Sequence, residues 1–372
     1  MAEPARKSNP ATTPAVTLRL WRSAARNSRH CQRQARNALF TALVGFVAAQ
    51  LALSLVIACW LPQLRDPLFW TKLFRFQGRL ASSPRSLSIA CFGSSRTIYG
   101  LPGQVVEQTL AQELERDVVV GNLGVWGAGP IAQRLHIERL LASGVLPDVI
   151  VLEILPVHFT AAPQPQELLL FPEQDQSWQD RKLLAGFGKP PDAEWWSTVL
   201  LPAYHQRATI MSKLYPSLLQ PIYRRDWGQA GDDTGWEPLK GSGQSPAVLA
   251  ATRGEFEPKL AQLAPGGLPA RAFAETLTLA RQAGCAVVVV FMPEGPAMRS
   301  WYRPESAGQL EQLVRTECAR VGASVIDARA WLPEESFRDS HHLYPPGAAE
   351  FGQRFGAALA ARLHGQARRT DK

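Results

Sequence analysis

A 24-residue stretch without a charged side chain, Ala38–Leu61, constrains this chain more than any other feature of the sequence. A helix of that length, rising 1.5 Å per residue, covers roughly the 30 Å hydrocarbon core of a bilayer. Gln50 is its only strongly polar member, and Trp60 stands where interfacial aromatic residues gather. The stretch therefore predicts a single transmembrane anchor.

Three other interpretations of the stretch remain open. It is also compatible with a buried core helix, or with a cleaved signal peptide, although the apolar region of a signal peptide usually has only about 7–15 residues. The tetrapeptide Val56–Cys59 resembles a bacterial lipoprotein cleavage box, which would make Cys59 a lipidation site, but a 37-residue leader would precede the apolar stretch.

The positive charge of the chain is concentrated before this stretch. Residues 1–37 hold eight Lys/Arg and one acidic residue, a balance of +7, whereas the chain as a whole is +8. The remainder thus carries 32 basic against 31 acidic side chains, which disfavours nucleic-acid binding by the body. Because basic flanks stay cytoplasmic, residues 1–37 are predicted as a cytoplasmic arm and the rest of the chain as extracytoplasmic.

After a juxtamembrane connector at 62–85, short apolar runs alternate with segments of helical periodicity. This alternation predicts a three-layer α/β/α domain with about five parallel strands. The predicted strands are Leu87–Phe92, Val118–Gly121, Asp148–Leu155, Cys285–Phe291 and Ser324–Asp327. The predicted helices are Leu101–Glu115, Pro130–Ser143, Ala270–Ala283, Ser306–Val321 and Gly347–His364.

Residues 156–266 interrupt the alternation with many Pro, Gln and Trp residues. A structureless loop of that length is improbable inside a compact domain, so the segment is interpreted as a largely helical insertion. Within it, the Gly/Asp/Ser-rich stretch Gln229–Ser245 is expected to be a flexible loop. The α/β domain accordingly covers 86–364, and 365–372 form a tail.

Three loops at predicted carboxyl ends of strands hold the residue types of a nucleophilic site. They are Gly93-Ser94-Ser95, the glycine-rich stretch Gly121–Gly129, and Asp339-x-x-His342. A serine hydroxyl becomes a good nucleophile when an imidazole takes its proton, and the imidazole is oriented by a carboxylate. The backbone amides of Ser95 and of a glycine in the second loop could then bind an oxyanion.

Each loop alone has a simpler explanation. Gly-Ser-Ser is an ordinary turn, Asp-x-x-His is a common helix cap, and a glycine-rich turn could bind phosphate. However, the chain has no G-x-G-x-x-G spacing for dinucleotides, no Walker motif and no G-x-S-x-G elbow. It also lacks a C-x-x-C pair or a His-rich cluster, so no metal or cofactor is predicted and the five cysteines are expected to be free thiols.

At these motifs the sequence resembles the SGNH/GDSL hydrolase superfamily, over roughly residues 86–155 and 285–360. The family's Gly-Asp-Ser block corresponds to Gly93-Ser94-Ser95, so the resemblance implies Ser95 as nucleophile, with Ser94 in place of the aspartate. The last block implies His342 as base and Asp339 as its orienting residue, followed by Leu343 and Gly347. The neighbouring His341 leaves some ambiguity, which the spacing to Asp339 resolves in favour of His342.

Two further blocks complete the comparison. The second implies an oxyanion glycine, which points to Gly127, with Gly124 as a weaker match. The third departs from the family, because Leu155-Pro156-Val157-His158 stands where the family has an oxyanion asparagine. His158 or a residue of the insertion could supply the missing donor, and without one the site would be weakened.

A last group of candidates follows the fourth predicted strand. Glu294, Arg299 and Tyr302 lie at the same sheet edge and could contact a polar substrate. An equally acceptable interpretation is a packed lip that contains an Arg–Glu pair.

The anchor and the large insertion are similar to those of envelope members of the superfamily that modify surface polymers. The resemblance implies a serine esterase or O-acyltransferase acting on ester groups of surface glycans, located at a bacterial cell membrane. The alternative is a catalytically silent envelope scaffold that binds glycans through its Trp-rich insertion; the missing asparagine favours it. Nucleotide binding by the glycine-rich loop is a third, weaker alternative.

Overall fold

A five-stranded parallel sheet organises the body of the protein. The computed structural model describes residues 15–160, 165–190, 193–220, 231–241 and 243–370, without the side chains of 15–29 and 366–370. The strands are β1 (Leu87–Phe92), β2 (Val118–Asn122), β3 (Val149–Ile154), β4 (Ala286–Phe291) and β5 (Ser324–Asp327). Their order is β2-β1-β3-β4-β5, with every neighbouring pair parallel. The predicted α/β class is confirmed.

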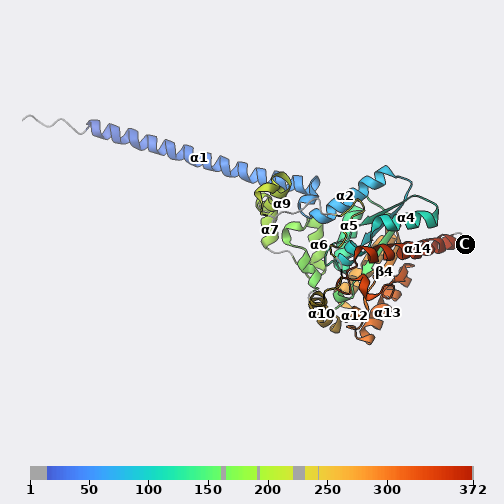
Figure 1. Cartoon of the computed structure of the whole chain (residues 1–372). Coiled ribbons are helices and arrows are strands. Elements are labelled where there is room, and N and C mark those ends of the chain that lie inside the picture. The colour runs from blue at the N-terminus through green and yellow to red at the C-terminus, as the bar shows by residue number, and fades with distance from the viewer. Residues whose placement is uncertain (1–14, 161–164, 191–192, 221–230, 242, 371–372) are drawn as a thin grey trace, which may run out of the picture.

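Helices cover both faces of the sheet, as Figure 1 shows. The helices α4 (Gly103–Leu114) and α14 (Pro345–Thr370) share one hydrophobic cluster with the sheet. A second cluster joins the opposite face to α2 (Pro67–Ser82), α5 (Pro130–Ala142), α11 (Gly267–Gln282) and α13 (Pro304–Val321). Burial on both faces explains why the strands read as continuous apolar runs rather than as alternating patterns.

The strand order creates a topological switch point between β1 and β3. From β1 the chain proceeds outward to β2 and then returns to β3 on the other side of β1. In open parallel sheets, binding sites form in the crevice beyond the carboxyl ends at such a point. Because Phe92 is paired with Leu152, the segments that follow these residues leave the sheet side by side.

The insertion between β3 and α11 is largely helical, as predicted. It contains α6 (Trp178–Gly186), α7 (Ala193–Leu200), α8 (Pro202–His205), α9 (Arg207–Leu214) and α10 (Pro246–Ala261). Short 3₁₀ turns precede and separate them, among them η2 (Pro156–His158), η3 (Gln166–Leu170) and η5 (Pro216–Leu218).

Part of the stretch predicted to be flexible is instead packed against the edge strand. Residues 231–241 of Gln229–Ser245 form a turn in which Asp232 accepts hydrogen bonds from the backbone N–H groups of Thr234 and Trp236. The Thr234 carbonyl accepts from the Asn122 N–H at 2.7 Å, so the turn extends the backbone pairing of β2. Composition alone could not predict this pairing. Residues 229, 230 and 242 lie outside the described residues.

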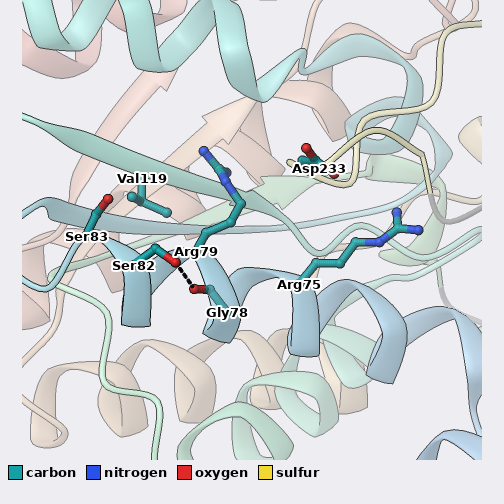
Figure 2. A pocket seen from close by; sticks show the side chains of 7 residues that line it. All are labelled: Arg75, Gly78, Arg79, Ser82, Ser83, Val119 and Asp233. Carbon is teal, nitrogen blue, oxygen red and sulfur yellow. Dashed lines mark hydrogen bonds between the residues drawn. The ribbon is translucent and has the colours of Figure 1, made fainter.

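The same turn borders a cavity of about 320 Å³ beside α2. Figure 2 shows Arg75 and Arg79 leaving α2 on the side where Asp233 lies. The Arg79 guanidinium donates to the Val120 carbonyl at 2.8 Å and to Glu107 at 2.6 Å, and Arg75 donates to the Gly231 carbonyl at 2.9 Å. These arginines tie the connector helix α2 to the sheet and the insertion.

Helix α1 (Ala15–Cys59) extends away from the body (Figure 1). Its part from His30 to Cys59 is long and apolar enough to cross a membrane, and only 11% of its most apolar window is buried. The helix begins well before the predicted anchor and includes much of the basic arm, of which residues 1–14 lie outside the described residues. All five cysteines are free.

Candidate active site

The first element of the site is the turn between β1 and the short helix α3 (Ser95–Gly100). Ser94 caps this helix, because its Oγ accepts a hydrogen bond from the Arg96 N–H at 3.1 Å. Ser95 is the first helical residue. Gly93 allows the turn to pass close to β3, since a Cβ at this position would lie 2.0 Å from Thr97 Oγ1 and 2.2 Å from Glu153 Oε2.

The second element is the loop before α14, which approaches Ser95 from 247 positions away. His342 Nε2 lies 2.7 Å from Ser95 Oγ, and His342 Nδ1 lies 2.8 Å from Asp339 Oδ2. An ionised carboxylate only accepts hydrogen bonds, so Nδ1 carries the proton and Nε2 is free to accept from the serine hydroxyl. The structure therefore brings together the three residues predicted as nucleophile, base and orienting acid.

Backbone contacts hold this loop in an unusual conformation. Ser340 has a φ of 71°, in the left-handed region that non-glycine residues rarely adopt. Its Oγ accepts from the Met298 N–H at 2.8 Å, and its carbonyl accepts from the Gly295 N–H at 2.8 Å. The segment after β4 thus fixes the backbone on which Asp339 and His342 are mounted.

The charge of Asp339 is stabilised despite its burial. Burial raises the pKa of its carboxyl, but the hydrogen bonds from His341 and His342 outweigh that effect and hold the pKa well below its usual range. The Asp339 carboxylate also accepts the backbone N–H of His342 at 2.8 Å. Burial, together with the charge of His342, lowers the pKa of His341 to about 4, so His341 is neutral near pH 7.

The glycine-rich loop after β2 lies beside this constellation. Trp126 Nε1 donates to the Tyr99 hydroxyl at 3.0 Å, and the Tyr99 ring packs edge-on against the His342 ring at 5.4 Å between centroids. The Val125 N–H donates to the Gly93 carbonyl at 2.9 Å, which ties the loop to the nucleophile turn. Gly127, the predicted oxyanion residue, has a φ of 68° in this loop.

His158 supports the same loop from the third strand end. A Cβ on Gly129 would lie 2.5 Å from His158 Cγ, so the ring packs directly on the loop backbone. Burial and the charge of Lys259 lower the pKa of His158 to about 4, opposed by a hydrogen bond with the Gly127 backbone. The neutral His158 ring therefore contacts the Gly127 backbone. His158 follows β3, where the SGNH/GDSL family has the asparagine that this sequence lacks.

Glu167, which sequence analysis did not single out, also holds this loop. Its carboxylate accepts from the N–H groups of Gly129, Ile131 and Ala132 at 3.0–3.1 Å. These donors belong to the first turn of α5, whose N–H groups have no intrahelical acceptor. Burial raises the pKa of Glu167 to about 7. The insertion thereby contributes directly to the position of the glycine-rich loop.

Glu153 is the second residue that sequence analysis missed. It is 2% exposed at the end of β3, and its Oε2 accepts from the Ser94 N–H at 2.7 Å and from Thr97 Oγ1 at 2.5 Å. Its Oε1 accepts from Ser94 Oγ at 2.8 Å. The only signals in the sequence are a single Glu inside an apolar strand and a serine where Gly-Asp-Ser has its aspartate.

The residues predicted to contact substrate after β4 have partners within the protein. Glu294 is 1% exposed, and its carboxylate accepts a hydrogen bond from the Tyr302 hydroxyl at 2.8 Å. The Arg96 guanidinium lies 3.4 Å from the same carboxylate. Arg299 donates to the backbone carbonyls of Glu294 and Arg329. This arrangement is a packed lip, and its Arg–Glu pair joins Glu294 to Arg96 rather than to Arg299.

Comparison with known proteins gives distant structural likenesses. No family model matches the sequence, and no curated protein matches it. A Mycobacterium smegmatis aryl esterase is 12% identical with a TM-score of 0.31, covering 74% of this chain and 99% of its own.

Two more esterases show similar values. An acetyl-xylooligosaccharide esterase from Geobacillus stearothermophilus is 12% identical with a TM-score of 0.33, covering 72% of this chain and 91% of its own. A carbohydrate acetylesterase from Sinorhizobium meliloti is 13% identical with a TM-score of 0.27, covering 74% of this chain and 98% of its own. All three are named as esterases, the class of enzyme that the resemblance to the SGNH/GDSL superfamily implies. Identities and TM-scores this low assign no activity to this chain.

Proposed function

We propose that this protein is a membrane-anchored serine esterase or O-acyltransferase that acts on ester groups, of surface glycans by analogy with the family it resembles. The observation that carries the proposal is the Ser95–His342–Asp339 constellation, with 2.7 Å from Ser95 Oγ to His342 Nε2 and 2.8 Å from His342 Nδ1 to Asp339 Oδ2. Both distances suit proton transfer without rearrangement.

The chemistry follows from these contacts. Ser95 Oγ attacks the ester carbonyl while His342 Nε2 takes its proton, and the N–H groups of Ser95 and Gly127 receive the oxyanion. His342 then gives the proton to the departing alcohol, which leaves an acyl group on Ser95. Water attacking this acyl-enzyme completes hydrolysis, and a sugar hydroxyl attacking it completes acyl transfer. Asp339 stays ionised and keeps His342 in the required tautomer.

The location proposed for this chemistry is the outer face of a bacterial cell membrane. The apolar part of α1 supplies the span, and the balance of +7 in residues 1–37 favours a cytoplasmic N-terminus. The body after Leu61 is then extracytoplasmic, where surface glycans are accessible.

A fluorophosphonate probe on the full chain in detergent micelles tests the proposal. We expect labelling of the wild-type protein and its loss in both Ser95→Ala and His342→Ala. Ser197→Ala is the matched control, because Ser197 Oγ also lies 2.9 Å from a histidine, His205 Nε2. A folded wild-type protein that is not labelled, or labelling that survives Ser95→Ala, would contradict the proposal. Glycan binding unaffected by Ser95→Ala would instead select the silent scaffold.

The two possible acyl acceptors are separated by a second measurement. Turnover of a simple aryl acetate is followed by two products, the aryl alcohol released on acylation of Ser95 and the free acetate released by water, with and without an added oligosaccharide. An esterase is expected to release both in equal amounts at a rate independent of the sugar. A transferase is expected to release the aryl alcohol faster when the sugar is present, with the acetyl group recovered on the sugar rather than as free acetate.

A further inference from the structure

Helix α9 and the turn after it have polar residues inside and apolar residues outside. Gln206, Thr209 and Ser212 are 4%, 2% and 5% exposed. By contrast, Leu214, Tyr215 and Leu218 are 62%, 57% and 71% exposed. A surface in contact with water normally shows the opposite arrangement. A surface in contact with lipid requires this one, because polar groups must find partners inside the protein.

The segment to which these residues belong, 193–219, is called the collar below; it comprises α7, α8, α9 and η5. Its only charged residues are Glu194, Arg207 and Lys213. Its inner side contacts the rest of the insertion through hydrogen bonds. Gln206 Nε2, for example, donates to the Gln174 carbonyl at 2.8 Å.

The collar is attached to the candidate membrane span itself. Gln50, the strongly polar residue of the apolar stretch, is 8% exposed, and its Oε1 accepts from the Ala203 N–H at 3.2 Å. Ala203 lies in the first turn of α8, where an N–H has no intrahelical acceptor. Gln50 precedes Cys59 by nine residues, or about 13 Å along a helix, so the collar lies alongside the apolar part of α1.

Exposed apolar side chains occur on both elements, which contact each other. Figure 1 shows α7 near the C-terminal part of α1, and α1 contacts both α7 and α8. Exposed apolar side chains on α1 include Leu43, Val47, Leu51 and Leu55. On the collar and next to it they include Trp178, Trp196, Leu200, Leu201 and Tyr204. Trp60, 68% exposed, ends the apolar stretch, where aromatic residues gather at membrane interfaces.

We infer that the collar is seated in the bilayer, in the leaflet on the side of the body, next to the anchor. Leu214, Tyr215 and Leu218 enter the acyl region, while the exposed cations Arg207 and Lys213 meet the lipid phosphates. The partner is the bilayer that α1 spans, so this inference rests on the anchor described under the proposed function. The body is then attached to the membrane by two elements rather than by a single helix.

Lipid-specific quenching of an environment-sensitive label tests the inference. Cysteines are introduced singly at Leu43, Leu214, Leu218 and Gln312 in the full chain with Cys31→Ser and Cys59→Ser, labelled with a nitrobenzoxadiazole dye, and reconstituted into vesicles. Leu43 reports the anchor, and Gln312, exposed on α13 far from α1 in Figure 1, reports water. Half of the lipid carries brominated acyl chains, which quench only dyes within the bilayer.

We expect quenching at Leu214 and Leu218 that is comparable to that at Leu43 and several-fold greater than that at Gln312. Quenching at Leu43 alone would contradict the insertion of the collar into the bilayer, while the membrane anchor would stand. Quenching at none of the positions in reconstituted protein would contradict both the anchor and the insertion of the collar. As a second measurement, Leu214→Glu is expected to reduce quenching at Leu218, whereas Glu317→Gln on α13 leaves it unchanged.

Discussion

The Ser94 hydroxyl donates a hydrogen bond to the Glu153 carboxylate across 2.8 Å, although the two residues lie 59 positions apart. Ser94 stands where the Gly-Asp-Ser block has its carboxylate, and Glu153 supplies one from the neighbouring strand. In this chain the carboxylate that holds the nucleophile turn therefore comes from β3 and not from the turn itself. This relationship makes Glu153 a positioning residue for Ser95.

Replacing Glu153 with glutamine tests this role. The amide offers one acceptor oxygen for three donors, so the turn is expected to shift and kcat/KM on a simple acetyl ester to fall by about 10²-fold. The buried Arg96 guanidinium, 3.8 Å from Glu153, also loses a counter-charge, which lowers the free energy of unfolding by about 3 kcal/mol. Glu257→Gln is the control, because its ion pair with Arg253 is exposed to solvent and contributes little to stability.

The Ser94→Asp substitution completes the test. Alone, it places a second carboxylate against Glu153, and two such groups cannot both ionise at contact distance. Combined with Glu153→Gln, it restores one carboxylate to the turn. The double variant is therefore expected to be more active and more stable than either single variant. Simple addition of the two losses would contradict a shared role.

Gly93→Ala is expected to abolish activity. Its Cβ would meet the Thr97 hydroxyl and the Glu153 carboxylate, both of which are held in hydrogen bonds and cannot move away cheaply. Gly308→Ala on α13, where a Cβ meets nothing within 4 Å, is the matched control. It should raise the free energy of unfolding by about 0.5–1 kcal/mol and leave the ester-hydrolysis rate unchanged. Equal activity in both variants would refute the tight packing of the turn.

Asp339→Asn separates orientation from proton transfer. The amide can present its N–H₂ to His342 Nδ1 and favour the wrong tautomer, so kcat is expected to fall by about 10⁴-fold at pH 7. Fluorophosphonate labelling should slow in parallel. Glu335→Gln, at an exposed position in the turn before this loop, serves as the control. A loss of less than tenfold in Asp339→Asn would mean that another group orients His342.

Acidification is expected to destabilise the protein between about pH 6.5 and 4. Burial, with the charge of Arg139, lowers the pKa of His136 to about 4 in the folded protein, from an ordinary value of 6.5. Below pH 6.5 the unfolded chain binds a proton that the folded protein refuses, so the stability present above pH 6.5 is lost as the pH falls. His136→Gln should reduce the slope of unfolding free energy against pH by up to about 1.4 kcal/mol per unit, measured by urea unfolding.

Glu167 provides a control of opposite sign. Its pKa is raised to about 7 by burial, so the folded protein holds a proton that the unfolded chain releases. The free energy of unfolding should therefore fall as the pH rises from about 4.5 to 7, and Glu167→Gln should remove this contribution. A slope that is unchanged in both variants would contradict the buried, shifted state of these groups.

The strands and helices of the body were predictable because burial on both faces writes continuous apolar runs into the sequence. Three strand predictions, Val118–Gly121, Asp148–Leu155 and Cys285–Phe291, differ from the structure by one residue at one or both ends; at Cys285 the reason is that its N–H pairs with the Ala280 carbonyl instead of with β3. The loops that carry Ser95, Asp339 and His342 were predictable because polar side chains with complementary chemistry follow strand ends. Their catalytic roles remain predictions.

Other features depend on contacts that a linear pattern does not record. The sequence leaves Glu294 as a candidate for substrate contact, because its partner Arg96 lies 198 positions away along the chain. The local sequence signals for Glu153 and Glu167 are weak, since one carboxylate in a strand or a turn is commonplace. The reversed polarity of α9 became visible only when burial was known, because Leu, Ser and Thr at helical spacing do not tell which face is covered.

The position of the supporting carboxylate on β3, at Glu153, affects how chains with a similar turn are found by sequence searches. A search for three consecutive letters around the nucleophile would pass over any protein that keeps the acid on an adjacent strand. A three-dimensional template of the turn, with a buried carboxylate within 3 Å of the backbone N–H that precedes the nucleophile, would retrieve chains with the arrangement seen here. Chains with this arrangement are therefore better found by comparing the backbone geometry of the turn than by searching for a three-residue sequence motif.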